Sequence, residues 1–316
     1  MLDVIALIIP LFGLIALGAV VGRLKRLPLQ EMGWLNTFII YLALPALFFN
    51  LLSRTPVETL TQWDFVAANI GATFLILALT FVLGLIGTRG DIGAATVQGL
   101  AGAYGNIGYM GPGLALLAFG EAAAVPVALI FCFENIMHFT LAPALMALAG
   151  KQKQGPLRVA WTVVRQIVTH PFIIATAVGV AAAAIKFQPP EPVARLIGYL
   201  AQAAAPCALF AMGVTLALRP LKRVPLALGY IVPIKLLVHP LLMYAVLSAA
   251  GDFDPVWVTS AVLLAALPTA TNVFVIAQQY DVWTERASAA VLATTVLSVA
   301  TVSGLLYAFK TGMLGG

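Results

Sequence analysis

The chain has 316 residues, of which 62% are hydrophobic and 9% are charged, and it carries a formal net charge of +5. Soluble domains use about 25% charged residues, so this composition, with a mean hydropathy of +1.02, excludes a soluble enzyme or binding module. The sequence pI near 9.3 does not indicate nucleic-acid binding, because the basic residues lie in short connections between apolar segments, where they orient membrane helices.

Apolar segments long enough to cross a membrane, which takes about 20 helical residues, recur along the whole chain. The first begins beside Asp3 without a preceding basic region, which favours a membrane span over a signal peptide. The longest connection between segments, 150–165, is basic and carries no soluble domain. The sequence predicts an all-α polytopic membrane protein with ten transmembrane segments, at 3–22, 33–52, 65–87, 93–119, 124–149, 166–186, 193–218, 225–250, 255–280 and 284–309.

The two halves of the sequence repeat at a constant offset of 161 positions. Proline and glycine are common in membrane helices, so the evidence is the shared register rather than any single match. Each half, 1–150 and 151–316, contains five segments, and because five is odd the halves must face opposite ways, as in the inverted repeats of secondary transporters. The matched pairs are Pro10 and Pro171, Gly18 and Gly179, Lys25 and Lys186, Pro28 and Pro189, Pro45 and Pro206, and Phe49 and Phe210.

Basic residues gather on one side of the predicted topology. Twelve of the sixteen outside the segments lie in the connections that follow odd-numbered segments, and basic connections stay in the cytoplasm. Both termini are therefore expected outside the cytoplasm, in a bacterial inner membrane. The twelve are Arg23, Lys25, Arg26, Arg89, Lys151, Lys153, Arg158, Arg165, Arg219, Lys222, Arg223 and Arg286.

The fourth segment is interrupted at its middle. Five glycines between Gly102 and Gly113 are poor helix formers, Pro112 lacks a backbone N–H, and Asn106 adds an amide. Backbone groups freed in the membrane are tolerated only where they line a cavity or are buried in protein, and transporters build substrate sites from such broken helices. The alternative is a glycine-rich helix that packs closely against a neighbour.

The ninth segment has a similar interruption at Pro268. If the helix restarts there, Thr269 or Thr271 can cap its open N–H groups, with Asn272 beside them. The restarted half-helix then presents a positive dipole end at mid-membrane, and the fourth segment does the same after Gly111. Two such ends facing one point would attract an anion. The alternative is two independent proline kinks.

Ionisable residues within the segments are functional candidates, because they are costly in hydrocarbon. Glu134 and His138 share one helix face, as do Lys235 and His239, since each pair is four residues apart. Lys235 is predicted to attract a carboxylate, and Glu134 or His138 to carry a coupling proton. The alternative is a structural Glu134–Lys235 pair that faces no substrate. Asn69, in the third segment, is expected to lie away from the break.

The remaining features indicate packing rather than chemistry. Cys132 and Cys207 lie in apolar segments, as expected of small packing residues. Motifs for zinc proteases, redox dithiols and nucleotide-binding loops are absent from the sequence, so neither an enzyme nor a bound cofactor or metal is predicted. Pro45 and Pro206 are expected to kink their helices. Interhelical hydrogen bonds are expected to account for the amides Asn50, Asn69, Gln98, Asn135 and Gln202.

Four stretches resemble the auxin efflux carrier family of bacterial and plant transporters, which includes malonate carriers. They read LALPALFFN (42–50), GNIGYMGPGLALLAFGE (105–121), APCALFAMG (205–213) and LPTATNVFVIAQQYD (267–281). The resemblance implies two inverted five-helix repeats whose fourth and ninth helices cross at their broken centres. It also implies a scaffold from segments 1, 2, 6 and 7, a transport domain from the other six, and a homodimer. The long cytoplasmic loop of some plant members is absent.

The sequence therefore predicts a secondary transporter that moves a small organic anion, such as malonate or an auxin-like acid, by alternating access. Its coupling to H⁺, to Na⁺ or to the membrane potential alone stays open. A Na⁺-coupled symporter resembling bile-acid carriers, which share the crossed-helix plan, is the alternative within transport. A channel, a membrane receptor and a membrane enzyme are the alternatives from other classes. The predicted substrate-binding residues are Asn106, Tyr109, Gly111, Pro112, Lys235, Pro268, Thr269, Thr271 and Asn272, and the predicted coupling residues are Glu134, His138 and His239.

Overall fold

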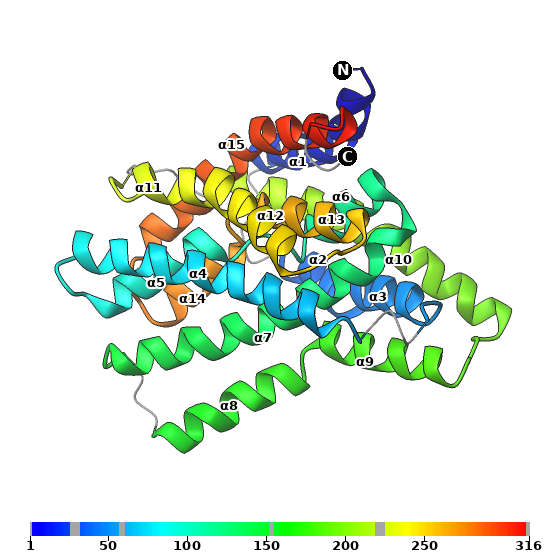
Figure 1. Ribbon diagram of the computed structural model, residues 1–316, viewed down its shortest axis with the longest axis horizontal. Helices are drawn as coiled ribbons and strands as arrows, with labels where there is room; N and C mark the ends of the chain where they lie inside the picture. The colour runs from blue at the N-terminus through cyan, green and yellow to red at the C-terminus, as the bar shows by residue number, and fades with distance from the viewer. Residues whose placement is uncertain (1, 26–31, 57–60, 152–154, 219–224, 314–316) are drawn as a thin grey trace. The chain divides into compact units, whose positions relative to one another are not determined.

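The computed structural model describes residues 2–25, 32–56, 61–151, 155–218 and 225–313, and their regular structure is helical throughout (Figure 1). No strand occurs in these residues, although one isolated bridge joins Gly105 and Thr269. Six helical stretches in the described chain are long and apolar enough to cross a membrane. The prediction of a polytopic all-α membrane protein is thereby confirmed.

Contacts within the chain divide it into two compact units. The first comprises Met1–Gln62, Gly108–Cys132 and Val168–Pro220, and the second comprises Trp63–Ile107, Phe133–Ile167 and Leu221–Gly316. The boundary after Ile107 falls within the interruption of the fourth predicted segment, so the two halves of that segment belong to different units.

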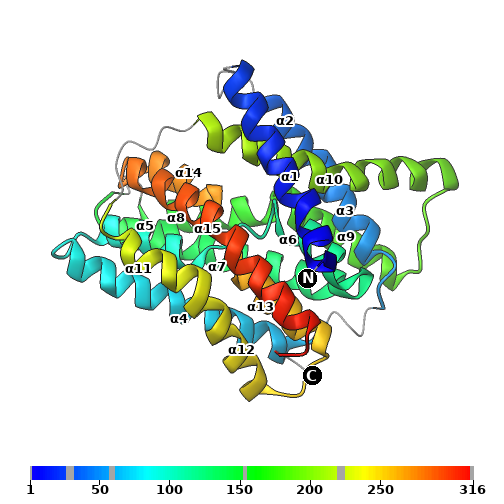
Figure 2. The same ribbon diagram turned by 90° about the horizontal axis from the view of Figure 1, so that it is seen from above.

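The first unit is built from two long helices and several shorter ones. The long helices are α1 (Leu2–Lys25) and α10 (Glu191–Leu218), which pack against each other, as Figure 2 shows. The others are α2 (Met32–Phe38), the π-helical turn η2 (Ile39–Ala43), α3 (Leu44–Leu52), α6 (Gly111–Phe119), the 3₁₀ turn η4 (Glu121–Ala123), the start of α7 (Ala124–Leu148) and α9 (Pro171–Ala184).

Glycines determine how closely α1 and α10 approach. A Cβ atom added at Gly18 would collide with the Phe210 carbonyl oxygen, and one added at Gly213 would collide with the Ile15 carbonyl oxygen. Each helix therefore contributes one glycine at which the backbone of the other passes. Small residues at membrane helix interfaces allow this close approach.

The second unit holds the longer part of the chain. Its helices are α4 (Trp63–Gly87), α5 (Ile92–Ala103), most of α7, nearly all of α8 (Pro156–Val168), α11 (Leu228–Pro233), the π-helical turn η5 (Ile234–Val238), α12 (His239–Ala250), α13 (Pro255–Ala265), α14 (Thr271–Gln279) and α15 (Thr284–Lys310).

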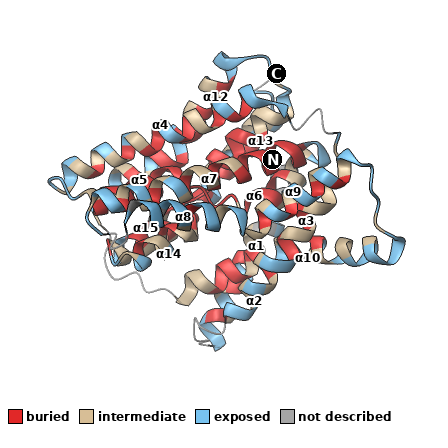
Figure 3. Ribbon diagram, turned by 90° about the horizontal axis from the view of Figure 1, so that it is seen from below, coloured by how far each residue is buried: buried red, intermediate tan, exposed pale blue. Residues whose placement is uncertain are grey.

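The core of the second unit surrounds its broken helices. Every residue in 93–107 and in 260–270 is buried, so α5, α13 and the segments that follow them lie inside the unit (Figure 3). α4, which packs along α5, exposes Phe74, Leu75 and Leu79 on its other side. This arrangement suits a membrane protein, because apolar side chains can face lipid while the interrupted backbone stays in protein.

The predicted segments correspond to the observed helices with few exceptions. Both predicted interruptions are present, since α5 ends at Ala103 and α6 begins at Gly111, while α13 ends at Ala265 and α14 begins at Thr271. The six long apolar stretches are Met32–Leu52, Trp63–Gly87, Glu121–Leu148, Glu191–Leu218, Leu228–Ala250 and Thr284–Lys310. Several residues used for orientation or repeat matching lie outside the described residues, namely Arg26, Pro28, Lys153, Arg219, Lys222 and Arg223.

The sixth predicted segment, 166–186, has the wrong start. The chain forms α8 over Pro156–Val168, breaks at Thr169 and His170, and begins α9 at Pro171. The break has a local cause, because proline disfavours helical geometry in the residue before it, and His170 is extended with φ −70° and ψ 124°. α8 exposes Leu157, Trp161 and Val164 beside two arginines, a pattern typical of helices at a membrane surface.

The two prolines predicted to kink their helices, Pro45 and Pro206, lie in different local structures. Pro45 follows the π-helical turn η2 and occupies the first turn of α3, where a missing N–H costs little. Pro206 lies inside α10, which continues as one α-helix through it. Pro10 likewise lies inside α1.

Candidate functional site

The interruptions after α5 and after α13 pair with each other through their backbones. The Asn106 N–H donates to the Pro268 carbonyl oxygen at 2.7 Å, and the Ala270 N–H donates to the Tyr104 carbonyl oxygen at 2.9 Å. These bonds form the antiparallel bridge between Gly105 and Thr269. Backbone groups freed by the two breaks thus satisfy one another inside the protein, as buried backbone groups must.

Thr269 supports this pairing from its side chain. Its hydroxyl donates to the Ala101 carbonyl oxygen at 2.7 Å, and its N–H donates to Thr294 Oγ1 at 3.1 Å. The expectation that Thr269 or Thr271 caps α14 is therefore wrong, because the N-cap residue is Ala270 and no side chain caps the helix. The Val273 N–H donates to the Ala270 carbonyl oxygen at 3.1 Å, which leaves the amides of Thr271 and Asn272 to bind an acceptor.

Tyr104 links the two interruptions to α7. Its hydroxyl donates to Asn135 Oδ1 at 2.5 Å and accepts from Asn272 Nδ2 at 2.9 Å. Its ring stacks on His138 with a centroid separation of 4.1 Å and an interplanar angle of 7°. The side chains of Asn272 and Thr271 remain partly exposed. Tyr104 therefore holds Asn272 at the start of α14 in a fixed orientation.

Lys235 is completely buried, with an exposed fraction of 0%. It lies in η5 and donates from Nζ to the carbonyl oxygen of Ala265, the last residue of α13, at 2.6 Å. A Cβ atom added at Gly105 would lie 3.4 Å from Nζ. The lysine thus places its amino group next to the bridge and at the C-terminal end of one half-helix, where the helix dipole favours the charged form of the group.

Glu134 is also buried, with 3% exposure, and it is held by α4. Asn69 Nδ2 and Thr73 Oγ1 each donate to Glu134 Oε1 at 2.9 Å. Asn69 therefore contacts the predicted coupling residue Glu134. No ion pair within 4.0 Å joins Glu134 to Lys235, so the two side chains are not in direct contact.

Comparisons with known proteins identify the family of this chain. A family model described as "Membrane transport protein" matches residues 3–306. The chain belongs to this family. A protein of Rhizobium meliloti (strain 1021) named "Putative malonate transporter" is 65% identical over 314 residues, which cover 99% of this chain and 98% of that protein. The match confirms the resemblance to auxin efflux carriers and identifies the chain as a membrane transporter rather than an enzyme.

The predicted substrate residues of this transporter fall in both units. Asn106, Pro268, Thr269, Thr271 and Asn272 are brought together in the second unit by the bridge and by α14. Lys235 belongs to the same unit. Tyr109, Gly111 and Pro112 belong to the first unit, in which Gly111 and Pro112 are buried in the first turn of α6 and Tyr109 is partly exposed.

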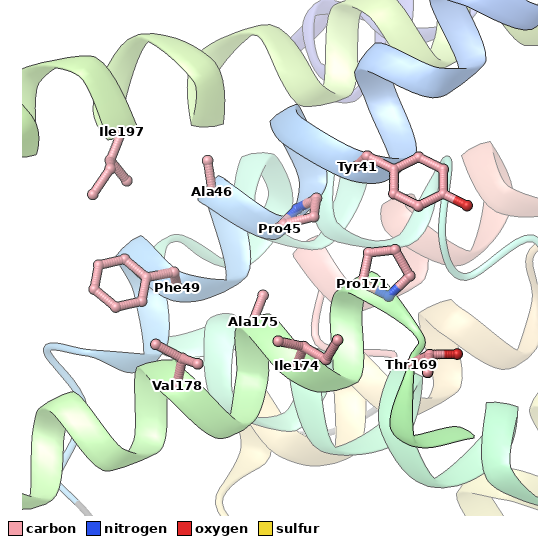
Figure 4. A pocket seen from close by; sticks show the side chains of 10 residues that line it. All are labelled: Tyr41, Pro45, Ala46, Phe49, Thr169, Pro171, Ile174, Ala175, Val178 and Ile197. Carbon is pink, nitrogen blue, oxygen red and sulfur yellow. The ribbon is translucent and has the colours of Figure 1, made fainter. Parts of the chain in front are cut away.

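The first unit contains a groove of about 490 Å³ between α3, α9 and α10 (Figure 4). Its lining is apolar apart from the hydroxyl groups of Tyr41 and Thr169, and it includes no charged side chain. A groove of this kind gives an anion no counter-charge. The second unit is therefore the better place for an anion site, because it carries Lys235 and the uncapped N-terminus of α14.

Tyr104 and Thr73 make hydrogen bonds with the predicted site residues that the sequence did not reveal. Tyr104 carries the bonds to Asn135 and Asn272, and Thr73 joins Glu134 to His239. The expected interhelical hydrogen bonds of Asn69 and Asn135 both form. The one sequence feature that could have drawn attention to Tyr104 is its position within a glycine-rich run. No sequence feature marks Thr73, because a buried threonine commonly hydrogen-bonds to its own helix.

Proposed function

We propose that this transporter is a secondary carrier that moves a small organic carboxylate, with malonate as the first candidate, across the bacterial inner membrane by alternating access. The family match establishes transport, and the name of the Rhizobium meliloti relative supports malonate. The observation that carries the proposal is the pairing of the two broken segments beside a buried lysine. Broken helices of this kind form the substrate sites of other transporters.

The carboxylate is proposed to bind at the start of α14. No side chain caps this helix, so the amides of Thr271 and Asn272 can donate to an anion with the support of the helix dipole. Asn272, oriented by Tyr104, adds an amide donor. The ammonium group of Lys235 provides positive charge on the other side of the bridge, which reduces the cost of bringing an anion into the membrane.

The proposed architecture is two inverted repeats of five spans each, with spans 1, 2, 6 and 7 as a scaffold. The composition of the first unit supports this, because it contains α1, α3, α9 and α10, which represent those four spans. α6 and the start of α7 also belong to the first unit, so the scaffold defined by contacts is larger than the resemblance implies.

Proton coupling is proposed in preference to Na⁺ coupling. Glu134 is the one acidic side chain among the buried polar residues of the described chain, and two of its neighbours are hydrogen-bond donors. A Na⁺ site requires several oxygen ligands, whereas Asn69 and Thr73 direct N–H and O–H groups toward the carboxylate. A protonatable carboxyl group fits this surrounding better than a cation ligand does.

Asn272→Ala and Asn106→Ala are each expected to weaken malonate binding by roughly ten- to a hundred-fold. The reason is the loss of one hydrogen bond to a charged group, about 1.5–3 kcal/mol, at about 1.4 kcal/mol per tenfold change in affinity. The measurement is a thermal-shift titration of the purified protein with malonate, followed by uptake into vesicles under imposed H⁺ or Na⁺ gradients.

The matched control is Gln278→Ala, which removes an exposed amide from the same half-helix. It should leave the malonate affinity unchanged. Intact binding in both asparagine variants would place the anion elsewhere in the molecule, and equal losses in the control would mean that α14 itself had been disturbed.

The orientation in the membrane gives a separate prediction. Because the basic connections follow odd-numbered segments, a reporter that is active only in the cytoplasm should be silent when it is fused after Gly316. The same reporter inserted between Gly150 and Lys151 should be active. Cytoplasmic activity at both positions would show that the chain after Gly150 crosses the membrane an even number of times and not the five predicted.

A further inference from the structure

A continuous series of polar contacts joins Lys235 to Glu134 inside the second unit. Lys235 Nζ lies 3.1 Å from His239 Nδ1, and His239 Nε2 lies 3.4 Å from Thr73 Oγ1, the longest contact of the series. Thr73 Oγ1 lies 2.9 Å from Glu134 Oε1. All four side chains are buried, with exposures of 0%, 1%, 0% and 3% in that order.

The chemistry of the groups gives these contacts one direction when Lys235 is charged. An ammonium group has only donors, so His239 Nδ1 must accept from it. The neutral imidazole then carries its proton on Nε2 and donates to Thr73 Oγ1, and the threonine hydroxyl donates to the Glu134 carboxylate. The ammonium also donates to the Ala265 carbonyl oxygen.

The same positions of the heavy atoms also fit the reversed set of bonds. A protonated Glu134 would donate to Thr73, Thr73 to His239 Nε2, and His239 Nδ1–H to a neutral Lys235 amine. The amine retains an N–H for the Ala265 carbonyl oxygen. The two arrangements therefore differ only in where the protons lie.

We propose that Thr73 and His239 form a proton wire between Glu134 and Lys235, which determines whether the crossing of the broken helices carries an ammonium group. In the transfer, Lys235 Nζ gives a proton to His239 Nδ1, His239 Nε2 gives one to Thr73 Oγ1, and Thr73 gives its own to Glu134 Oε1. Three bonds to hydrogen break and three form, His239 changes tautomer, and the ammonium–carboxylate pair becomes an amine and a carboxylic acid.

Through the wire, the charge of Lys235 follows whether an anion occupies the proposed site. This part of the inference rests on the proposed function. In the empty carrier the neutral pair is favoured, because desolvating two buried ions that do not touch costs more than their attraction returns. A carboxylate bound near Lys235 favours the ammonium form through its own charge. The proton then returns along the wire to Lys235, and the site acquires positive charge only when an anion is present.

His138 is the other titratable side chain that faces this region, and it is not part of the wire. Its Nδ1 lies 2.7 Å from the backbone carbonyl oxygen of Glu134, and its ring stacks on Tyr104. Its Nε2 has no hydrogen-bond partner in the structure. The structure therefore separates the two histidines that the sequence grouped as coupling residues.

The experiment is ¹⁵N NMR of histidine-labelled full-length protein, with His239→Gln to assign the signals. Without substrate, His239 is expected as the Nδ1–H tautomer in the wild type. In Glu134→Gln it is expected as the Nε2–H tautomer, because the amide oxygen accepts from Asn69 and Thr73 and leaves Thr73 Oγ1 to accept from His239. This comparison needs no ligand. Adding malonate to the wild type should convert His239 to the Nε2–H tautomer.

Thr73→Val is the variant that breaks the wire while preserving the shape of the side chain. It should abolish the malonate-dependent change of tautomer and, because Lys235 then receives no proton from Glu134, weaken malonate binding by at least about tenfold, which corresponds to about 1.4 kcal/mol. Thr73→Ser restores the hydroxyl and should restore both. The control is Thr96→Val, which removes a buried hydroxyl that bonds only the Ile92 carbonyl oxygen of its own helix.

The outcomes separate the wire from the proposed function. An identical His239 tautomer in the wild type and in Glu134→Gln would overturn the wire, whether or not malonate binds. Failure of the wild type to bind malonate or another carboxylate, with the expected difference between those two proteins, would overturn the proposed substrate and leave the wire supported.

Discussion

Lys235→Ala is expected to abolish carboxylate transport and to destabilise the protein by about 3–5 kcal/mol, as removal of one partner from a buried charged set does. The lysine is completely buried, and its loss would leave the Ala265 carbonyl oxygen and His239 without their donor. Because Ala265 ends α13, the break in that helix would lose the donor that satisfies its last carbonyl oxygen. The measurements are thermal unfolding of the purified protein and uptake into vesicles.

A second pair of variants distinguishes a structural lysine from a functional one. Lys235→Met retains most of the side-chain volume. Lys235→Met combined with Glu134→Gln removes both ionisable groups, while the oxygen of the introduced amide can still accept from Asn69 and Thr73. If the lysine serves only the fold, the double variant should regain both stability and transport, since a neutral replacement of a buried pair is tolerated. If its ammonium group attracts the anion, stability should return and transport should not.

The interruptions of the fourth and ninth segments could be predicted because their causes are local. Glycines between Gly102 and Gly113 and the proline at 268 disfavour helix wherever they occur, and the observed breaks at 104–110 and 266–270 follow them. The partners across the break could not be predicted in the same way. Thr269 could equally have capped its own helix, but the exposed carbonyl of Ala101 at the end of α5 takes its hydroxyl.

The position of a proline does not by itself predict where a helix breaks. Pro10 and Pro171 occupy matching positions of the repeat, yet α1 continues through Pro10 while the chain breaks before Pro171. The sequence does not reveal α8 as a separate helix because its arginines lower the mean hydropathy of 150–165, although its apolar residues recur at helical spacing.

The polar cluster could be predicted in part. Each histidine is correctly placed near the ionisable residue one turn before it, because contacts at a spacing of four follow from helix geometry. Asn69 and Thr73 lie 65 and 61 positions from Glu134, and no sequence pattern specifies contacts at that separation. The contact that distinguishes His239 from His138 is made with one of these distant residues, Thr73.

Gly213→Ala is expected to be the most damaging single methyl addition in the first unit. Its Cβ atom would meet the backbone carbonyl of Ile15 and would lie 3.0 Å from the Ala19 backbone nitrogen, and neither atom can move without displacing α1. Overpacking of this kind typically costs about 1–3 kcal/mol. Gly13→Ala is the control, because it adds the same methyl group to α1 where no atom lies within 4 Å. Thermal unfolding should therefore detect a loss for Gly213→Ala and none for Gly13→Ala.

The double variant Gly18→Ala with Gly213→Ala tests whether one helix contact accounts for both effects. Gly18 approaches the backbone of Phe210 and Val214, next to the place where Gly213 approaches Ile15 and Ala19. Once the first methyl group has separated α1 from α10, the second finds space, so the combined loss of stability should be clearly less than the sum of the single losses. Additive losses would mean that the two glycines act at independent contacts. Malonate affinity of the protein that remains folded should be unchanged in all three variants, because the proposed anion site lies on residues of the second unit.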